Sequence, residues 1–81
     1  MKATVTIVGV GERRTGKGKN GKNYDIAQVA FTYPDTRIDG VNAGNCVVNG
    51  EDLDKYKLFP GTEVECLIMY RNYQPYIACF I

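Results

Sequence analysis

At 81 residues the chain has room for one small domain, residues 1–81, which buries roughly 60–65% of its unfolded surface. Apolar residues make up 44% of the chain and charged residues 23%, an ordinary balance that argues against disorder, and no apolar stretch is long enough for a membrane span. The net charge of +1 hides a polarised chain, because residues 1–24 hold six Lys and Arg against one Glu, whereas residues 25–81 hold four against eight acids.

The first half of the chain predicts three strands. Apolar and polar residues alternate with a period of two, which is typical of β-strands, over Met1–Val10 and Tyr24–Tyr33. Between them, residues 13–22 carry five positive charges, three glycines and no apolar side chain, so they predict an exposed loop that cannot pack into a core. A third strand is predicted over Val41–Val48, interrupted at Gly44 by a bulge or a sharp bend.

The second half predicts one helical turn and two more strands. Asn49–Tyr56 begins with a capping residue and early acids, which favours a short helical turn, and Pro60-Gly61 is a turn signal. Glu63–Tyr70 and Pro75–Ile81 read as strands joined by a tight hairpin at Arg71–Gln74. We therefore predict an all-β fold, a five-stranded OB-fold barrel with a projecting basic hairpin loop; an SH3-like barrel is the alternative.

The basic loop is the strongest functional signal. A cationic, glycine-rich loop that reaches out of a sheet is suited to lying along a phosphate backbone, although charged loops are also common as plain solvated surface. We predict that its five cations contact nucleic-acid phosphates: Arg13, Arg14, Lys17, Lys19 and Lys22.

The six tyrosines add an aromatic component beside this charge. Tyr24 follows the loop directly, and Tyr73 lies in the last hairpin, where a ring can stack on a base while its hydroxyl stays in water. We predict a stacking role for these two. For Tyr33 and Tyr76 a half-buried packing role is at least as well supported.

The residue types argue against catalysis and against a bound metal. Histidine and serine are absent, which excludes the common nucleophile–histidine pairs. Cys46, Cys66 and Cys79 are far apart without a paired spacing, so we expect reduced thiols in the core or at an interface. We expect a protein that is not an enzyme and that needs no cofactor, and the absence of a signal-like N-terminus predicts a cytoplasmic location.

One block of the sequence resembles a known family. Residues 14–28, Arg-Thr-Gly-Lys-Gly-Lys-Asn-Gly-Lys-Asn-Tyr-Asp-Ile-Ala-Gln, are similar to the basic loop and following strand of filamentous-phage single-stranded DNA-binding (helix-destabilising) proteins. The resemblance implies a small OB-type homodimer that coats single-stranded DNA with little sequence preference in the cytoplasm of a bacterial host. It also implies the site residues Arg13, Arg14, Lys17, Lys19, Lys22, Tyr24, Ile26, Arg71 and Tyr73.

The predicted function is therefore non-enzymatic binding of single-stranded DNA in phage or plasmid DNA replication. Two alternatives stay open from the residues alone. The barrel is either a protein-interaction module with the loop as a solvated edge, or an OB-type RNA-binding protein. No small-molecule substrate or membrane is expected as a partner.

Overall fold

The computed structural model describes all residues from 1 to 81, and the predicted all-β class is confirmed. Its elements are β1 (Lys2–Val10), β2 (Arg14–Lys17), β3 (Asn23–Pro34), β4 (Val41–Asn49), α1 (Gly50–Lys55), β5 (Glu63–Arg71) and β6 (Gln74–Phe80). The chain thus forms six strands rather than the predicted five, and the extra strand is β2. The single helix is far too short to cross a lipid bilayer.

The strands form one antiparallel sheet in the order β2-β3-β1-β5-β6, with β4 on the other edge of β3. β1 and β2 pair with successive parts of the same edge of β3, from Thr6 opposite Thr32 to Lys17 opposite Asn23. The prediction of a loop over residues 13–22 was therefore wrong for its first half. Backbone pairing with β3 needs no apolar side chain, so this strand leaves no hydrophobic pattern in the sequence.

A bulge or a sharp bend was predicted at Gly44, and the bulge is absent, since β4 pairs with β3 in unbroken register. Glycine is needed there for space instead. A Cβ atom at position 44 would lie 2.8 Å from the Phe31 ring and 2.8 Å from the carbonyl oxygen of Pro75, where β6 passes β4. Register shifts occur elsewhere, in β1 after Ile7 and in the β5–β6 ladder after Leu67.

The core lies on one face of β3. Ala27, Val29, Phe31 and Tyr33 of β3 are buried, in alternation with more exposed neighbours. They pack against side chains from β1, β4, β5, β6 and the segment around α1; among these are Val5, Ile7, Val48, Leu53, Leu58, Cys66, Ile68 and Ile77. Truncating a fully buried ring such as that of Phe31 removes about 3–5 kcal/mol of stability.

The three cysteines are free thiols in different environments. Cys66 is buried, and burial raises its pKa to about 12; Cys46 is half-buried, and burial raises its pKa as well. Cys79 is exposed. Of the three thiols expected in the core or at an interface, Cys66 therefore lies in the core and Cys46 lies partly in it. Asn49 stands at the start of α1, but its side chain makes no capping hydrogen bond.

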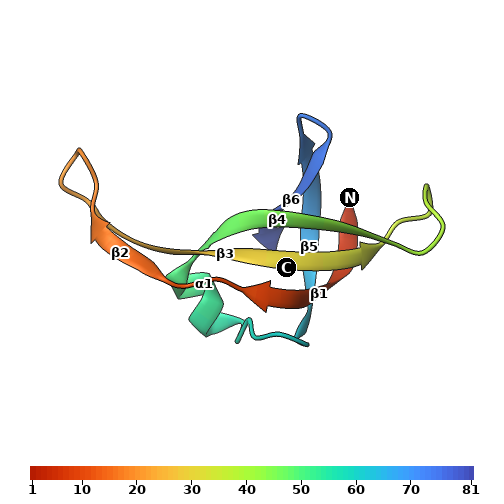
Figure 1. The fold of residues 1–81 in the computed structure, drawn as a ribbon, viewed down its shortest axis with the longest axis horizontal. Helices are drawn as coiled ribbons and strands as arrows, with labels where there is room; N and C mark the ends of the chain where they lie inside the picture. Colours follow the sequence, from red (N-terminus) through yellow and green to blue (C-terminus); the bar gives the residue numbers. More distant parts are fainter.

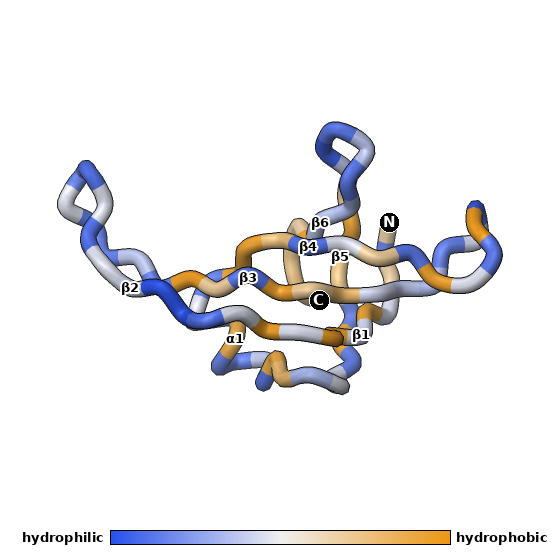
Figure 2. The backbone as a smooth tube through the Cα atoms, in the orientation of Figure 1, coloured by the Kyte–Doolittle hydropathy of each residue, from blue (hydrophilic) through white to orange (hydrophobic).

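The molecule is elongated, with a longest extent of 44 Å. Figure 1 shows the β2–β3 hairpin at one end of the long axis, the β3–β4 connection at the other end, and the β5–β6 hairpin projecting sideways between them. Figure 2 shows that the tips of the β2–β3 and β5–β6 hairpins are largely hydrophilic, while apolar residues gather where the strands cross. The fold therefore presents several separated polar projections around one small core.

Candidate nucleic-acid interface

The β2–β3 hairpin is an ordered arm, and only its tip is a loop. Its strands pair from Arg14 opposite Ile26 to Lys17 opposite Asn23. The tip is closed by backbone hydrogen bonds, from the Gly18 amide to the Lys22 carbonyl at 2.7 Å and from the Gly21 amide to the Gly18 carbonyl at 3.0 Å. The cations are thus carried on a backbone whose geometry is already fixed.

Four cations of the arm have no acidic partner. The side chains of Arg14, Lys17, Lys19 and Lys22 are exposed, and none of them takes part in an ion pair. Their charge is therefore available to a polyanion, and the surrounding acids do not neutralise it locally.

Tyr24 lies among these cations with its ring against the opposite strand. It pairs with Gly16, and a Cβ atom at Gly16 would stand 2.7 Å from the Tyr24 hydroxyl and 2.9 Å from its Cζ. The ring thus lies across the bare glycine backbone, an arrangement in which an aromatic residue compensates for a strand glycine. The residue is 43% exposed, so part of the ring remains open for stacking.

Arg13 differs from the other four cations. Its Nε donates to Asp25 Oδ1 at 3.0 Å, its Nη2 bonds Asp25 Oδ2, and its Nη1 donates to Asp54 Oδ1 at 2.9 Å. The hydrogen bond from Arg13 lowers the pKa of Asp25, and the two carboxylates raise the pKa of Arg13. Gly50, at the start of α1, leaves the space that this cluster fills. Arg13 therefore ties the base of the arm to α1.

Ile26 shares a face of β3 with Tyr24, two residues away along the strand. It is half-buried and lines a shallow hollow of about 190 Å³ together with Arg14, Gln28 and Val47. Gln28 and Val47 are surface residues of β3 and β4 that the sequence did not mark. Period-two alternation on β3 places Gln28 on this face, but nothing in the sequence indicates that Val47 pairs opposite it.

The structure separates Arg71 and Tyr73 from this arm and places them on the β5–β6 hairpin (Figure 1). Tyr73 is 98% exposed at the tip, with a backbone φ of 64°, and Asn72 before it has a φ of 52°. Arg71 lies with its guanidinium carbon 5.2 Å from the centre of the Tyr76 ring. Tyr76 is half-buried, and Tyr33 is buried in the core, in line with the packing alternative for both.

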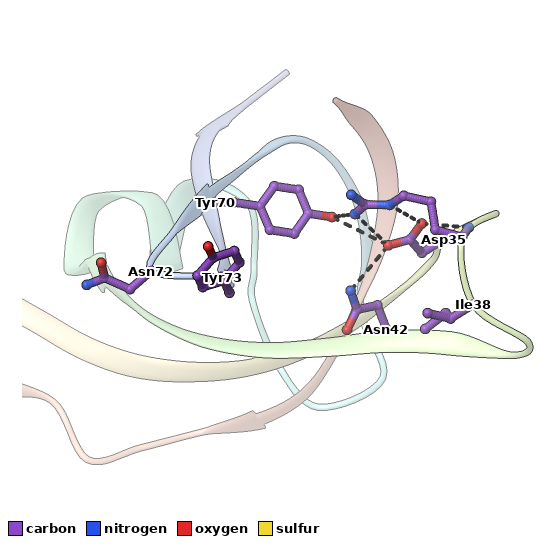
Figure 3. Close-up of a pocket in the computed structure, with 7 residues that line it drawn as sticks. Asp35, Ile38, Asn42, Tyr70, Asn72 and Tyr73 are labelled. Carbon is purple, nitrogen blue, oxygen red and sulfur yellow. Dashed lines mark hydrogen bonds and ion pairs between the residues drawn. The ribbon is translucent and has the colours of Figure 1, made fainter.

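A second polar cluster surrounds Asp35, the first residue of the β3–β4 connection. The Asp35 side chain is 2% exposed and accepts hydrogen bonds from Arg37 Nε at 3.0 Å, from Arg37 Nη2 at 2.9 Å and from Asn42 Nδ2 at 3.2 Å (Figure 3). These bonds, led by those from Arg37, hold the pKa of Asp35 far below its usual range. The Tyr33 hydroxyl lies 2.7 Å from that of Tyr70, and burial raises the pKa of Tyr33 to about 12.

No group of three or more His, Cys, Asp or Glu side chains is arranged to hold a metal ion. Comparison of the chain with protein-family models, with curated proteins and with solved structures gives no match in any of the three.

Proposed function

We propose that this protein binds single-stranded DNA through the β2–β3 arm, as a non-enzymatic strand-coating protein of phage or plasmid replication in the bacterial cytoplasm. The observation that carries the proposal is the exposed Tyr24 ring, seated on Gly16 in the midst of four cations without acidic partners. The resemblance of residues 14–28 to filamentous-phage single-strand-binding proteins supports the same proposal.

In this proposal the arm makes two kinds of contact, one with the phosphates and one with the bases. Arg14, Lys17, Lys19 and Lys22 neutralise phosphates and release counterions, a contribution that duplex and single strand share. Tyr24 stacks on an unpaired base, which contributes about 1–3 kcal/mol and is denied to bases already stacked in a duplex. The preference for single strands therefore comes from Tyr24, with Ile26 as an apolar neighbour on the same face.

Arg13 has a different part in this proposal from the one that the sequence predicted. Its guanidinium already faces Asp25 and Asp54, so its positive charge is offset where a phosphate would approach. We assign Arg13 to positioning the arm on α1. Its direct contact with phosphate stays a prediction that this ion-pair cluster disfavours.

The finer fold assignment is part of the proposal. An OB-type arrangement is supported by β1 pairing with both β3 and β5, by α1 between β4 and β5, and by the close passage of β6 over β4 at Gly44. A homodimer is proposed on the resemblance. The apolar last strand adds little support for a dimer, because Ile77 is buried within the domain and the centre of the Phe80 ring lies 4.7 Å from that of Tyr56. Sedimentation of the protein as a monomer at working concentration would remove the dimer.

The proposal is tested by fluorescence anisotropy with a labelled oligo-dT of about 16 nucleotides, near the upper site size for one OB domain. We expect binding that weakens with salt at a slope of about −0.7 per neutralised phosphate, and a triple Lys17, Lys19, Lys22→Ala variant with a shallower slope. The same length of duplex should bind more weakly than the single strand.

Three results would argue for another function. A folded protein that binds no oligonucleotide at low salt supports the protein-interaction module. Tighter binding of oligo-U than of oligo-dT supports an RNA-binding protein. A salt slope that is unchanged in the triple lysine variant removes the arm from the interface.

A further inference from the structure

The largest concave surface lies away from the arm, between the β3–β4 connection and the β5–β6 hairpin. It is an open cleft of about 700 Å³ (Figure 3). Its walls are the Asp35 cluster on one side and the turn residues Asn72 and Tyr73 on the other. The exposed side chain of Ile38 borders it. Neither hairpin alone makes this cleft, so it exists only in the folded chain.

The fold itself uses most of the polar groups on one wall. Asp35 is buried and engaged by Arg37 through two nitrogens, and the Tyr70 hydroxyl lies 3.4 Å from it. Arg37 in turn lies with its guanidinium carbon 4.8 Å from the centre of the Tyr70 ring. Arg37 is thus fixed in position by a buried carboxylate and by an aromatic ring beneath it.

Two groups around the cleft have no partner within the protein. Arg37 Nη1 makes no hydrogen bond, and the Tyr73 ring is 98% exposed. Asn72 and Tyr73 both have positive φ, a conformation that glycine adopts freely and that is unfavourable for tyrosine. A strained, fully exposed aromatic residue that packs against nothing is a feature found at binding sites.

We propose that this cleft binds an unpaired nucleobase of the strand that the arm holds, with the base stacked on Tyr73 and its edge hydrogen-bonded by Arg37 Nη1. The proposal rests on the proposed function. The charge of Arg37 is offset by Asp35, and no other cation lines the cleft, so a phosphate gains little there. An exposed aromatic ring and a fixed guanidinium donor are groups that bind bases.

Because of where the cleft lies, the proposed base contact depends on the length of the bound DNA strand. The arm lies at one end of the 44 Å axis and the β3–β4 connection at the other (Figure 1), so only a strand that spans much of the molecule reaches both. A strand of about 4 nucleotides, the lower site size of such domains, occupies the arm alone.

The test compares two strands of equal length, about 16 nucleotides, one of oligo-dT and one abasic throughout, which keeps the phosphates and lacks the bases. Tyr73→Gly and Arg37→Gln should each weaken oligo-dT binding by about 5-fold or more, with the abasic affinity and the salt slope unchanged. Lys19→Gln is the matched phosphate control and should weaken both strands, with a slope lower by about 0.7. Tyr73→Gly alters only an exposed turn, so this variant still tests the proposal if Arg37→Gln does not fold stably.

Oligo-dT affinity that equals the wild-type value in Tyr73→Gly overturns the proposal. Equal weakening of both strands by Arg37→Gln, with a lower salt slope, also overturns it and identifies a phosphate contact. Loss of the effect with a strand of about 4 nucleotides supports the two-point geometry. If the wild-type protein binds neither strand, the proposed function itself is wrong. That result differs from one in which the protein binds DNA and the cleft substitutions have no effect.

Discussion

The ring of Tyr24 lies across Gly16 on the neighbouring strand, in the space that a side chain at position 16 would fill. The absence of a side chain at position 16 therefore allows the Tyr24 ring to occupy this position. The pair holds the ring at a fixed angle on the arm, with one part against the backbone and the rest in solvent.

Gly16→Ala should displace the Tyr24 ring, because the new methyl group would stand 2.7 Å from its hydroxyl. We expect oligo-dT affinity to fall by about 5-fold, as for partial loss of one stacked base, with the salt slope unchanged. Gly18→Ala is the control, since its nearest neighbour is the Asn20 side-chain oxygen at 3.3 Å. Anisotropy titrations at several salt concentrations separate the two; equal affinities in both variants would show that the ring position does not matter.

Asp25→Asn should weaken DNA binding although it removes a negative charge beside the arm. Simple electrostatics predicts the opposite sign, because a more positive arm attracts phosphates more strongly. We expect weakening because Asp25 holds Arg13 and so sets the position of the arm on α1. The control is Glu12→Gln, which removes an exposed charge near the same site. Tighter DNA binding by both variants would show that Arg13 and Asp25 act only as surface charges and do not position the arm.

Asp35 should make stability sensitive to acid. Its folded pKa lies far below its unfolded value of about 3.9, so the stabilisation is fully present above that value and is lost as pH falls toward the folded pKa. Asp35→Asn should be less stable than wild type at pH near 7 and should lose less stability on acidification. Urea unfolding at neutral pH and below pH of about 4 measures this. Exposed Asp39→Asn is the control and should follow the wild-type curve.

Tyr73→Gly should stabilise the isolated protein while weakening DNA binding. Positive φ at Asn72 and Tyr73 is the pattern of a type I′ turn, for which Asn-Gly is the favoured pair. Relief of the strained tyrosine should add up to about 1 kcal/mol to the free energy of unfolding, measured in urea. Tyr76→Phe, outside the turn, should leave stability within about 0.5 kcal/mol of wild type. A destabilised Tyr73→Gly would mean that the ring packs against the fold.

The sequence predicted those parts of the fold whose signal is local. Alternation identified the long strands, and the hairpin at Arg71–Gln74 followed from its turn residues. β2 was missed because it buries no apolar side chain, which leaves no hydrophobic period to detect. The sequence shows a glycine at position 44 but not the reason for it, which is the close passage of β6 over β4 at this residue.

The site shows the same division. Composition and position along the chain predicted Tyr24 and the four cations without acidic partners as site residues. The structure places all five on the arm, and their contact with DNA stays a prediction. The different environment of Arg13 depends on Asp54, 41 residues away, and no local pattern reports such a pairing. The Asp35 cluster likewise joins a turn to Tyr70, 35 residues further on, so its part in forming a cleft emerges only from the tertiary structure.

β3 runs without interruption from the core to the root of the arm's tip, and β1 and β2 accompany it along one edge. The backbone of the arm is therefore ordered when the domain folds. If the arm binds DNA as proposed, it loses little further conformational entropy on binding, and less of the binding free energy is used for ordering than in a flexible basic loop.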